Sequence, residues 1–540
     1  MAVFKCVGLL ASGLLCAAAP QPQIAVRHES TISVADEAPS TAAVPLNHFM
    51  SYSIEFSSFP DFAGNISHPN TFSDNLLNNL ASFAGTKPII RVGGNTQDFA
   101  VFNATQTEAF IGSFNPILSE DYPTTISFGP AYFESYNTWP DVQFVHGFNL
   151  GGNSTSERQA LIESVPYACK ALSTGNLLHW ELGNEPDLFN STNAAFAKRP
   201  ATWGNEEYVD EWRNWTSAID CALREACPEL PISYYAPSFA GYSNGLDGVK
   251  VWELGINSDK DIAFMSSHNY VSGAPVPGVT LQGTLMNHTS SVVSINKQLD
   301  IARQLANLPE EMNADLPFIL GEHNSLYRQG RPGLSNTFGA TLWGVDFNLY
   351  CAASNIRRVH MHMGTNYRYQ SWQPISTDKD SIGTKAPYYG NVAVAAFIGD
   401  VEAAPPSIVN IPLADEKEAA YASYVDGKLA KIIVINMMAY NATDYNKEFI
   451  TGFPRPVVDY SFQLGSALAG KTASLQRLNA NGSDAISGVT FDGYSYNFEL
   501  DEGKPVLLQN VTRGEQVCAD GNGLVSVSVP WSSAVILELD

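Results

Sequence analysis

The segment Leu177-Leu-His-Trp-Glu-Leu-Gly-Asn-Glu185-Pro-Asp187 has the pattern of a strand that runs into a polar turn. Its first residues are mostly apolar or aromatic, and Gly183 and Pro186 interrupt the pattern after them. Similar runs recur between residues 45 and 400. The eight predicted strands are Phe49–Phe56, Pro88–Val92, Gln143–Asn149, Leu177–Leu182, Ile232–Ala236, Ile262–His268, Pro317–Gly321 and Arg358–Met363.

Longer segments with apolar residues three and four positions apart separate these strands. The predicted helices are Ser73–Phe83, Ser156–Leu172, Glu206–Glu225, Val292–Leu308 and Thr337–Ala353. Strands that alternate with helices form parallel sheets, so eight such units predict an α/β fold, a (β/α)8 TIM barrel, over residues 45–400. The helical pattern between the fifth and sixth strands is weak, and there the prediction depends on the number of strands.

The pattern changes at residue 401, where Ala403-Ala-Pro-Pro-Ser407 is typical of a linker. Residues 401–540 contain short β-branched runs between Gly, Asn and Asp turns, for example Lys431–Asn436 and Leu524–Val529. This pattern predicts a C-terminal all-β sandwich. Residues 20–44 also alternate polar and apolar residues, so we expect this N-terminal segment to join the sandwich as a strand.

The chain of 540 residues has a formal net charge of −24, although only 16% of its residues are charged. Hydrophobic residues make up 45% of it, which is enough to bury large cores and excludes a disordered chain. An acidic surface without a cluster of Lys and Arg repels phosphate backbones and anionic lipids. We therefore expect neither nucleic acid nor a membrane as partner, and a monomer or weak oligomer.

Residues 1–19 have the pattern of a secretory signal peptide, with Lys5 before an apolar run and Ala17–Ala19 at its end. The run is too short to span a membrane. Five cysteines would remain after cleavage, which permits at most two disulfides. Asn-x-Ser/Thr sequons support a secreted, extracellular glycoprotein. The predicted glycosylation sites are Asn65, Asn103, Asn153, Asn190, Asn214, Asn287, Asn441, Asn481 and Asn510.

Two acidic residues stand where predicted strands end. Glu185 follows the fourth strand, and Glu322 in Ile319-Leu-Gly-Glu322-His-Asn follows the seventh. The carboxyl ends of barrel strands meet at one face, where active sites lie, so the two carboxylates should share a cleft. Two carboxyl groups about 5 Å apart are typical of a retaining glycosidase, and a wider gap is typical of an inverting one.

Each motif alone has a simpler explanation. A Glu at a strand end is usually solvated or ion-paired, and Asn-Glu-Pro can form only a turn, because Pro186 disfavours the helical conformation at Glu185. Glu181 lies on the same strand and competes with Glu185 for the functional role. The pair on strands four and seven is what favours catalysis over these alternatives.

Asn184-Glu185-Pro186 together with Gly321-Glu322 resembles the clan A glycoside hydrolases. Three longer segments are similar to glycoside hydrolase family 79, which contains β-glucuronidases and heparanases, and in particular to its secreted fungal members. These segments are Arg91–Phe102, Trp180–Phe189 and Gly321–Phe338. The resemblance covers essentially the whole mature chain and implies that Glu185 is the acid/base and Glu322 the nucleophile of a retaining enzyme.

The resemblance also implies the substrate-binding residues. Asn184 would bind the sugar 2-hydroxyl, and His268 and Tyr270 would orient the nucleophile, while a single His or Tyr is as often a core residue. Tyr327 and the segment with Thr365 and Tyr367 would hold the C6 carboxylate of a uronic acid. Further expected sugar contacts are Glu55, Asn95 and Asp98.

Two other groups of residues are expected to stay outside the chemistry. Arg368 would point away from Tyr367 and Tyr369 along an extended segment. His360 and His362 share a face of the eighth strand, but two ligands without a third make packing in the barrel interior a better interpretation than a metal site. We therefore expect no metal and no cofactor.

Whether the enzyme cleaves at the end of a glycan chain or inside it is the remaining question. In heparanases, processing removes a segment after the second strand and opens the cleft, whereas residues 103–141 here are rich in aromatics and free of basic residues. We expect this segment to wall off the pocket, which favours an exo-β-glucuronidase acting on terminal glucuronate or 4-O-methylglucuronate of glycans such as arabinogalactan, or on aryl glucuronides. The alternatives are a heparanase-like endo-enzyme, a clan A glycosidase for a neutral sugar, and a catalytically silent glycan-binding protein.

Overall fold

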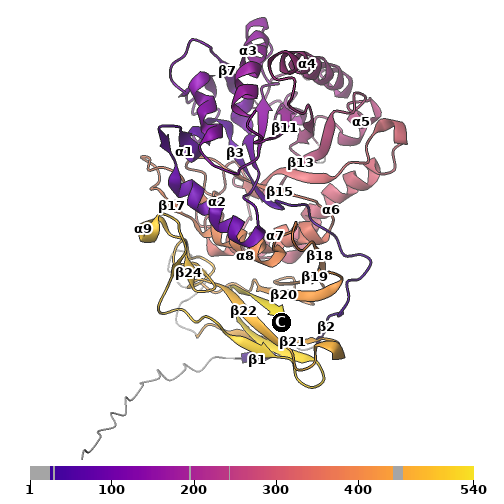
Figure 1. Ribbon diagram of the computed structural model, residues 1–540, viewed down its shortest axis with the longest axis vertical. Helices are drawn as coiled ribbons and strands as arrows, with labels where there is room; N and C mark the ends of the chain where they lie inside the picture. Colours follow the sequence, from indigo (N-terminus) through magenta and orange to yellow (C-terminus); the bar gives the residue numbers. More distant parts are fainter. Residues whose placement is uncertain (1–24, 28–30, 194–195, 242–243, 442–453, 540) are drawn as a thin grey trace, which may run out of the picture.

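The computed structural model describes residues 25–27, 31–193, 196–241, 244–441 and 454–539. It consists of a large α/β part and a smaller β domain packed beneath it in the view of Figure 1. The predicted signal peptide, residues 1–19, lies outside the described residues. Among the described residues, no helix combines the length and the apolar character that crossing a membrane requires.

The large part is a closed barrel of eight parallel strands that follow one another in chain order. The last strand pairs with the first, with Val359 opposite Met50, and this pairing closes the barrel. The predicted (β/α)8 fold is therefore confirmed. The strands are β3 (Met50–Glu55), β6 (Ile90–Gly93), β10 (Phe144–Phe148), β11 (Leu177–Leu182), β12 (Tyr234–Phe239), β13 (Ile262–Gly273), β14 (Phe318–Tyr327) and β15 (Val359–Met363).

Helices on the outside of the barrel join these strands. They are α2 (Thr71–Ala84), α3 (Thr155–Ala171), α4 (Asn205–Ala226), α5 (Gly248–Glu253), α6 (His288–Leu305), α7 (Phe338–Ala353) and α8 (Ala386–Ile398). The crossover from β6 to β10 uses the 3-10 segment η3 (Pro130–Asn137) in place of an α-helix. The weak helical pattern after the fifth strand corresponds to α5, which has only six residues.

Helix α8 had no periodic signal in the sequence because all of its residues are buried. A helix in contact with protein on every side has no polar face and hence no 3.6-residue alternation. Helices α7 and α8 lie between the barrel and the β domain, and α7, unlike α8, keeps the partly exposed residues Tyr350 and Ala353.

The β domain contains two sheets packed face to face around a separate hydrophobic core. The large sheet has the order β18 (Pro406–Ile411), β19 (Glu418–Val425), β20 (Lys428–Asn436), β28 (Ser533–Leu539), β22 (Thr472–Asn479), β23 (Thr490–Phe491), β24 (Tyr494–Ser495) and β25 (Val506–Leu507), with β26 (Gln516–Cys518) also on β22. Its other face packs on the barrel helices, since Tyr421 and Ile433 belong to the barrel's core cluster. The domain thus extends the barrel's hydrophobic core.

The N-terminal segment lies in the small sheet of the β domain. Strands β1 (Ala25–Arg27) and β2 (Ile32–Ser33) both pair in parallel with β21 (Val457–Gln463), and β27 (Leu524–Pro530) pairs with the other edge of β21. The described residues therefore run from the β domain through the barrel and back to the β domain.

One disulfide, Cys169–Cys227, joins the end of α3 to the residue after α4. Cys221, Cys351 and Cys518 are free thiols in the described chain, and Cys351 is buried. The sequence permitted two disulfides, but its remaining cysteines lie on elements that the fold keeps apart.

Candidate active site

Glu185 and Glu322 reach the same end of the barrel from two strands. Glu322 lies within β14, paired with His268 of β13, and Glu185 is the third residue after β11 ends at Leu182. The backbone of Glu185 adopts the left-handed conformation, with φ 52° and ψ 47°, and its amide donates to the Ser238 carbonyl at 3.0 Å. This conformation is strained for a residue with a side chain, and such strain is concentrated at functional sites.

The two carboxylates are close neighbours. One oxygen from each of Glu185 and Glu322, together with a ring nitrogen of His268, lie within 4.8 Å of one another. This separation matches the spacing of about 5 Å in retaining glycosidases and is too short for a water molecule between carboxyl groups, as inversion requires. The arrangement can therefore support attack by one carboxylate and proton donation by the other.

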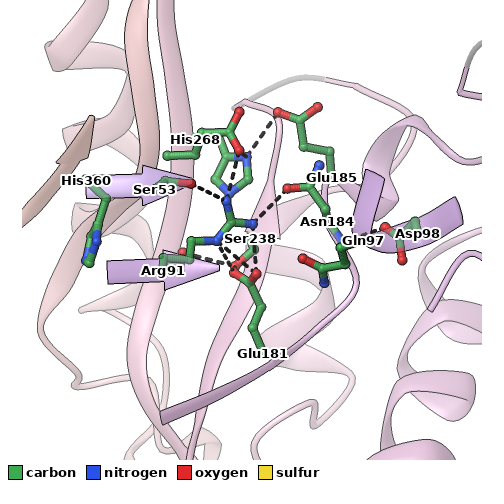
Figure 2. A network of polar contacts seen from close by, with 12 residues as sticks. Ser53, Arg91, Gln97, Asp98, Glu181, Asn184, Glu185, Ser238, His268 and His360 are labelled. Carbon is green, nitrogen blue, oxygen red and sulfur yellow. Dashed lines mark hydrogen bonds and ion pairs between the residues drawn. The ribbon is translucent and has the colours of Figure 1, made fainter. Parts of the chain in front are cut away.

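Arg91 on β6 is the centre of a polar network with Ser53, Glu181 and Asn184 (Figure 2). Its guanidinium donates to Glu181 at 2.9 Å, to Glu322 Oε2 at 2.9 Å and to the side-chain oxygen of Asn184 at 2.8 Å. Arg91 and Glu181 are fully buried, and Ser238 also donates to Glu181 at 2.6 Å. Glu181 is therefore the counter-ion of Arg91. Because Glu181 is buried in this ion pair, Glu185 and not Glu181 is the candidate catalytic carboxyl group.

Glu322 is held in its ionised form. Tyr270 donates to Glu322 Oε1 at 2.7 Å, and His362 Nδ1 lies 3.4 Å from Oε2. Burial opposes ionisation, but His362, His268 and Arg91 outweigh it and bring the pKa of Glu322 below the usual carboxyl range. A carboxylate that stays charged at low pH has the property that a nucleophile needs.

Glu185 has the opposite environment. Burial raises the pKa of Glu185, and the charge of Glu322 raises it further. His268 Nδ1 lies 3.0 Å from Glu185 Oε1 and 4.0 Å from Glu322, so this histidine contacts the expected acid/base more closely than the nucleophile. Because burial lowers the pKa of His268 to about 4, the ring is neutral and adds no positive charge that would favour ionisation of Glu185. The site thus pairs one protonated carboxyl with one ionised carboxylate.

Glu55 at the end of β3 lies against the same network. It accepts from the Thr96 hydroxyl at 2.6 Å and from the Tyr367 hydroxyl at 3.0 Å, and His362 Nε2 lies 3.3 Å away. Gly94 permits this approach, because it has φ +88° and a Cβ there would lie 2.6 Å from a Glu55 oxygen. His362 therefore links Glu55 to Glu322.

His362 is buried in the barrel interior as predicted, but it lies between two carboxylates, a role that the sequence analysis did not assign to it. His360 behaves as predicted for a packed residue: it is fully buried, with Nδ1 3.3 Å from the Tyr52 carbonyl. The cluster of Glu185, His268 and Glu322 offers ligand atoms for a metal ion, but Arg91 at 2.9 Å from Glu322 would repel a second cation there.

Two expected substrate contacts also form hydrogen bonds within the protein. Asp98 accepts from the backbone amides of Leu150, Gly151 and Asn184 at 2.7 to 2.9 Å, so its oxygens hold the loop that carries Asn184. Thr365 donates its hydroxyl proton to Asp61 at 2.7 Å, and the sugar contacts expected of Asp98 and Thr365 remain predictions. Local sequence could not reveal these partners, because they come from other strands and loops.

The remaining predicted residues lie at the mouth of the barrel. Asn95 is half-buried, and its side-chain oxygen lies 3.4 Å from the Asn184 amide. Tyr367 belongs to a cluster with Tyr122 and Tyr369, against which Tyr270 packs. Tyr327 is outside this cluster: it is 42% exposed, and its ring packs directly over Gly273, so its role in binding a carboxylate remains a prediction.

Two important residues, Arg91 and Tyr122, carried no assigned role in the sequence analysis. Arg91 had a usable signal, since a cation in the middle of an apolar strand, Ile90-Arg91-Val92, must be paired when buried. Tyr122 had none, because it lies in a polar loop far from its partners in sequence. Its burial beside Tyr367 and Tyr369 depends on how that loop folds over the barrel.

The barrel with its facing carboxylates defines the class of the protein: it is a glycoside hydrolase with a (β/α)8 catalytic barrel. Residues 420–536 match the family model described as glycosyl hydrolase family 79 C-terminal beta domain. The chain is 53% identical over 538 residues to a β-glucuronidase of Aspergillus niger, covering 98% of each chain. It is 50% identical to a β-glucuronidase of Neurospora crassa, covering 94% of this chain and 96% of that one. The chain belongs to glycoside hydrolase family 79.

Solved structures support the fold. A 4-O-α-L-rhamnosyl-β-D-glucuronidase from Fusarium oxysporum has a TM-score of 0.75 at 23% identity, covering 94% of this chain and 100% of that chain. A family 51 α-L-arabinofuranosidase from Bifidobacterium longum has a TM-score of 0.59 at 13% identity, covering 94% and 99%. The barrel with an attached β domain is thus shared by glycosidases of different specificity.

Proposed function

We propose that the protein is a retaining exo-β-glucuronidase that releases terminal β-linked glucuronate, or its 4-O-methyl form, from glycans such as arabinogalactan or from aryl glucuronides. The pair of Glu185 and Glu322, within 4.8 Å and with pKa values displaced in opposite directions, is the observation that carries the mechanism. The names of the two curated relatives support the glucuronide as substrate.

The reaction follows from the two protonation states. Glu322 attacks the anomeric carbon while Glu185 gives its proton to the departing oxygen, and a glycosyl ester of Glu322 forms. Glu185, now ionised, takes a proton from water, which attacks the same carbon and releases Glu322. Arg91 keeps the side chains of Glu322 and Asn184 in position during both steps, since it donates to both.

The pH dependence of kcat/KM should be a bell with widely separated limbs. Activity rises with pH as Glu322 ionises, below the ordinary carboxyl range, and falls as Glu185 loses its proton, above that range. We expect best activity on the acidic side of neutral. Initial rates on an aryl glucuronide from about pH 3 to pH 9 measure both limbs. An alkaline limb near about pH 4.5, or a maximum well above neutral, would contradict this assignment.

A uronate needs donors to offset the surrounding carboxylates. The pocket mouth has the buried hydroxyl groups of Tyr122 and Tyr369, while the hydroxyl groups of Tyr270 and Tyr367 already donate to Glu322 and Glu55. Hydroxyl donors bind a carboxylate without an opposing charge. Hydrolysis of an aryl β-glucuronide but not of the matching β-glucoside would support this specificity, and equal rates would favour a glycosidase for neutral sugars.

Exo action is supported by the loop that contains Tyr122. Within residues 103–141, strands β8 (Phe110–Ser113) and β9 (Thr125–Phe128) form a small sheet with β7 (Ala100–Phe102). Between β8 and β9, Asp121 accepts a bidentate ion pair from Arg368, with one bond of 2.9 Å. This clamp joins the loop to the segment after β15 and holds Tyr122 over Tyr367. The loop therefore acts as a wall beyond the first sugar.

Weakening the ion pair between Asp121 and Arg368 should make the loop within residues 103–141 less able to exclude a longer substrate. Asp121→Asn removes the charge of a bidentate pair, and we expect kcat/KM for an aryl glucuronide to fall about 10-fold. Cleavage inside a glucuronate-containing oligosaccharide labelled at its reducing end should rise relative to terminal release. Asp141→Asn, at an exposed position of the same segment, is the matched control. Unchanged product sizes and rates would rule out the wall.

The same oligosaccharide assay separates the alternatives. Heparan sulfate cut internally as readily as aryl glucuronides are hydrolysed would indicate a heparanase-like endo-enzyme. Binding of glucuronides without turnover would indicate a silent glycan-binding protein. Product anomer determined by NMR tests retention directly, since an initial α-anomer would require inversion.

We also propose that the protein is a secreted glycoprotein. Six of the nine predicted acceptors are exposed: Asn65, Asn103, Asn153, Asn214, Asn481 and Asn510. Asn287 and Asn441 are poor candidates, because both are buried and their side chains accept hydrogen bonds from Ser290 and Ser483. Asn190 is half-buried and donates to the Trp203 carbonyl. Mass spectrometry after enzymatic deglycosylation identifies the occupied sites.

A further inference from the structure

Ser238, near the end of β12, is bonded to both sides of the active site. Its hydroxyl donates to Glu181 Oε1 at 2.6 Å (Figure 2). Its backbone carbonyl accepts the amide of Glu185 at 3.0 Å. Ser238 therefore joins the counter-ion of Arg91 to the backbone of the expected acid/base. Its importance for catalysis rests on the function proposed above, in which Glu185 is that acid/base.

Both residues of the backbone bond have an unusual conformation. Ser238 has φ 55° and Glu185 has φ 52°, in the left-handed region that residues with a side chain rarely adopt. Such conformations persist only where surrounding contacts hold them. The Ser238 carbonyl is such a contact for Glu185, and the Glu181 carboxylate is such a contact for the buried Ser238.

The ion pair of Arg91 and Glu181 is the fixed point of this connection. Arg91 Nη2 lies 2.7 Å from Glu181 Oε2, and Arg91 Nη1 donates to Glu322 at 2.9 Å. Arg91 and Glu181 are fully buried, and hydrogen bonds between charged groups are stronger than those between neutral ones. The nucleophile is thus held directly by Arg91, whereas the acid/base is held indirectly, through Glu181 and Ser238.

The strand of the nucleophile also makes room for a second neighbour of Ser238. The Ser266 hydroxyl on β13 lies 3.0 Å from the Ser238 hydroxyl oxygen. A side chain at Gly321, the residue before Glu322, would collide with the Ser266 hydroxyl. The glycine of the Gly321-Glu322 motif therefore permits a contact that supports Ser238.

We propose that Ser238 is a positioning residue for the reaction: its hydroxyl, bonded to Glu181, sets the position of the Glu185 acid/base relative to the Glu322 nucleophile. Attack by one carboxylate and proton donation by the other depend on their relative placement. Ser238 acts through the backbone of Glu185 and lies outside the sequence motifs that indicate the family.

Ser238→Ala tests the proposal by removing the hydroxyl. A displaced acid/base matters most where the leaving oxygen needs a proton. We therefore expect kcat/KM to fall about 30-fold for an alkyl glucuronide and less than about 3-fold for 2,4-dinitrophenyl glucuronide. Ser238→Gly removes the hydroxyl and also the strain of the left-handed backbone, and it should show the same pattern. Restored activity in Ser238→Gly would assign the loss to backbone strain and overturn the proposal.

Ser233, directly before β12, provides a matched control. Its carbonyl accepts the Trp180 amide at 2.9 Å, and its hydroxyl lies 2.6 Å from His179 Nδ1. It thus makes the same two kinds of bond to β11 at the opposite end of the strand. Ser233→Ala should leave both rates within about 2-fold. Equal losses on the two substrates in Ser238→Ala would indicate a merely structural role for Ser238.

Hydrogen exchange separates this inference from the proposed function. If neither glucuronide is hydrolysed, the proposed function fails, but the fixation of Glu185 can still be measured. The peptide that contains Glu185 should exchange its amide hydrogens faster in Ser238→Ala than in the unmodified protein or in Ser233→Ala. Equal exchange in all three proteins would show that the hydroxyl does not fix Glu185 and would overturn the proposal.

Discussion

Replacement of Glu322 by glutamine is expected to lower kcat on aryl glucuronides by about 10⁴-fold or more. The amide is no nucleophile, so the glycosyl ester cannot form. The shape of the pocket should survive, because Tyr270 can still donate to the amide oxygen. Circular dichroism and the melting temperature check the fold, and steady-state rates measure the loss.

A covalent trap makes this prediction specific. A 2-deoxy-2-fluoro-glucuronide with a good leaving group slows the second step of a retaining reaction, so the intermediate accumulates. Peptide mapping should find the added mass on Glu322 in the unmodified enzyme and none in Glu322→Gln. A label on Glu185, or full turnover by Glu322→Gln, would overturn the assigned mechanism.

Replacement of Glu185 by glutamine should give a loss that depends on the leaving group. We expect kcat/KM to fall about 10³-fold for an alkyl glucuronide, whose leaving oxygen must be protonated. The loss should be much smaller for 2,4-dinitrophenyl glucuronide, whose leaving group departs as an anion. In this variant kcat/KM should depend more steeply on the pKa of the leaving group, and rates across a series of aryl glucuronides measure that slope. The alkaline limb of the pH profile should disappear in the same variant.

Azide rescue provides the control for Glu185. In Glu185→Ala the second step lacks a base, and the space left by the side chain admits a small anion. Azide should therefore raise kcat on the dinitrophenyl substrate and yield the β-glucuronosyl azide. Absence of rescue, or a uniform loss across leaving groups, would assign Glu185 a structural role and leave the acid unidentified.

The eight strands could be predicted from sequence because each is a short apolar run, which can be recognised from adjacent residues alone. Helix α8 could not, since burial on all sides removed its periodicity. Glu185 and Glu322 could be paired in advance because the barrel brings all strand ends to one face, a property of the topology. The hydrogen bonds of Asp98 and Thr365 could not be predicted because their partners, the Leu150 amide and the Asp61 carboxylate, lie on other segments.

By itself the sequence determined the barrel, the added β domain, the family and the two carboxylates, because each depends on residue type and on order along the chain. Only the tertiary structure decided how these carboxylates differ. Burial and Glu322 raise the pKa of Glu185, while His362 and Arg91 lower that of Glu322. Coulomb interactions depend on distances of a few ångströms, and those distances arise only when β6, β14 and β15 close into a barrel.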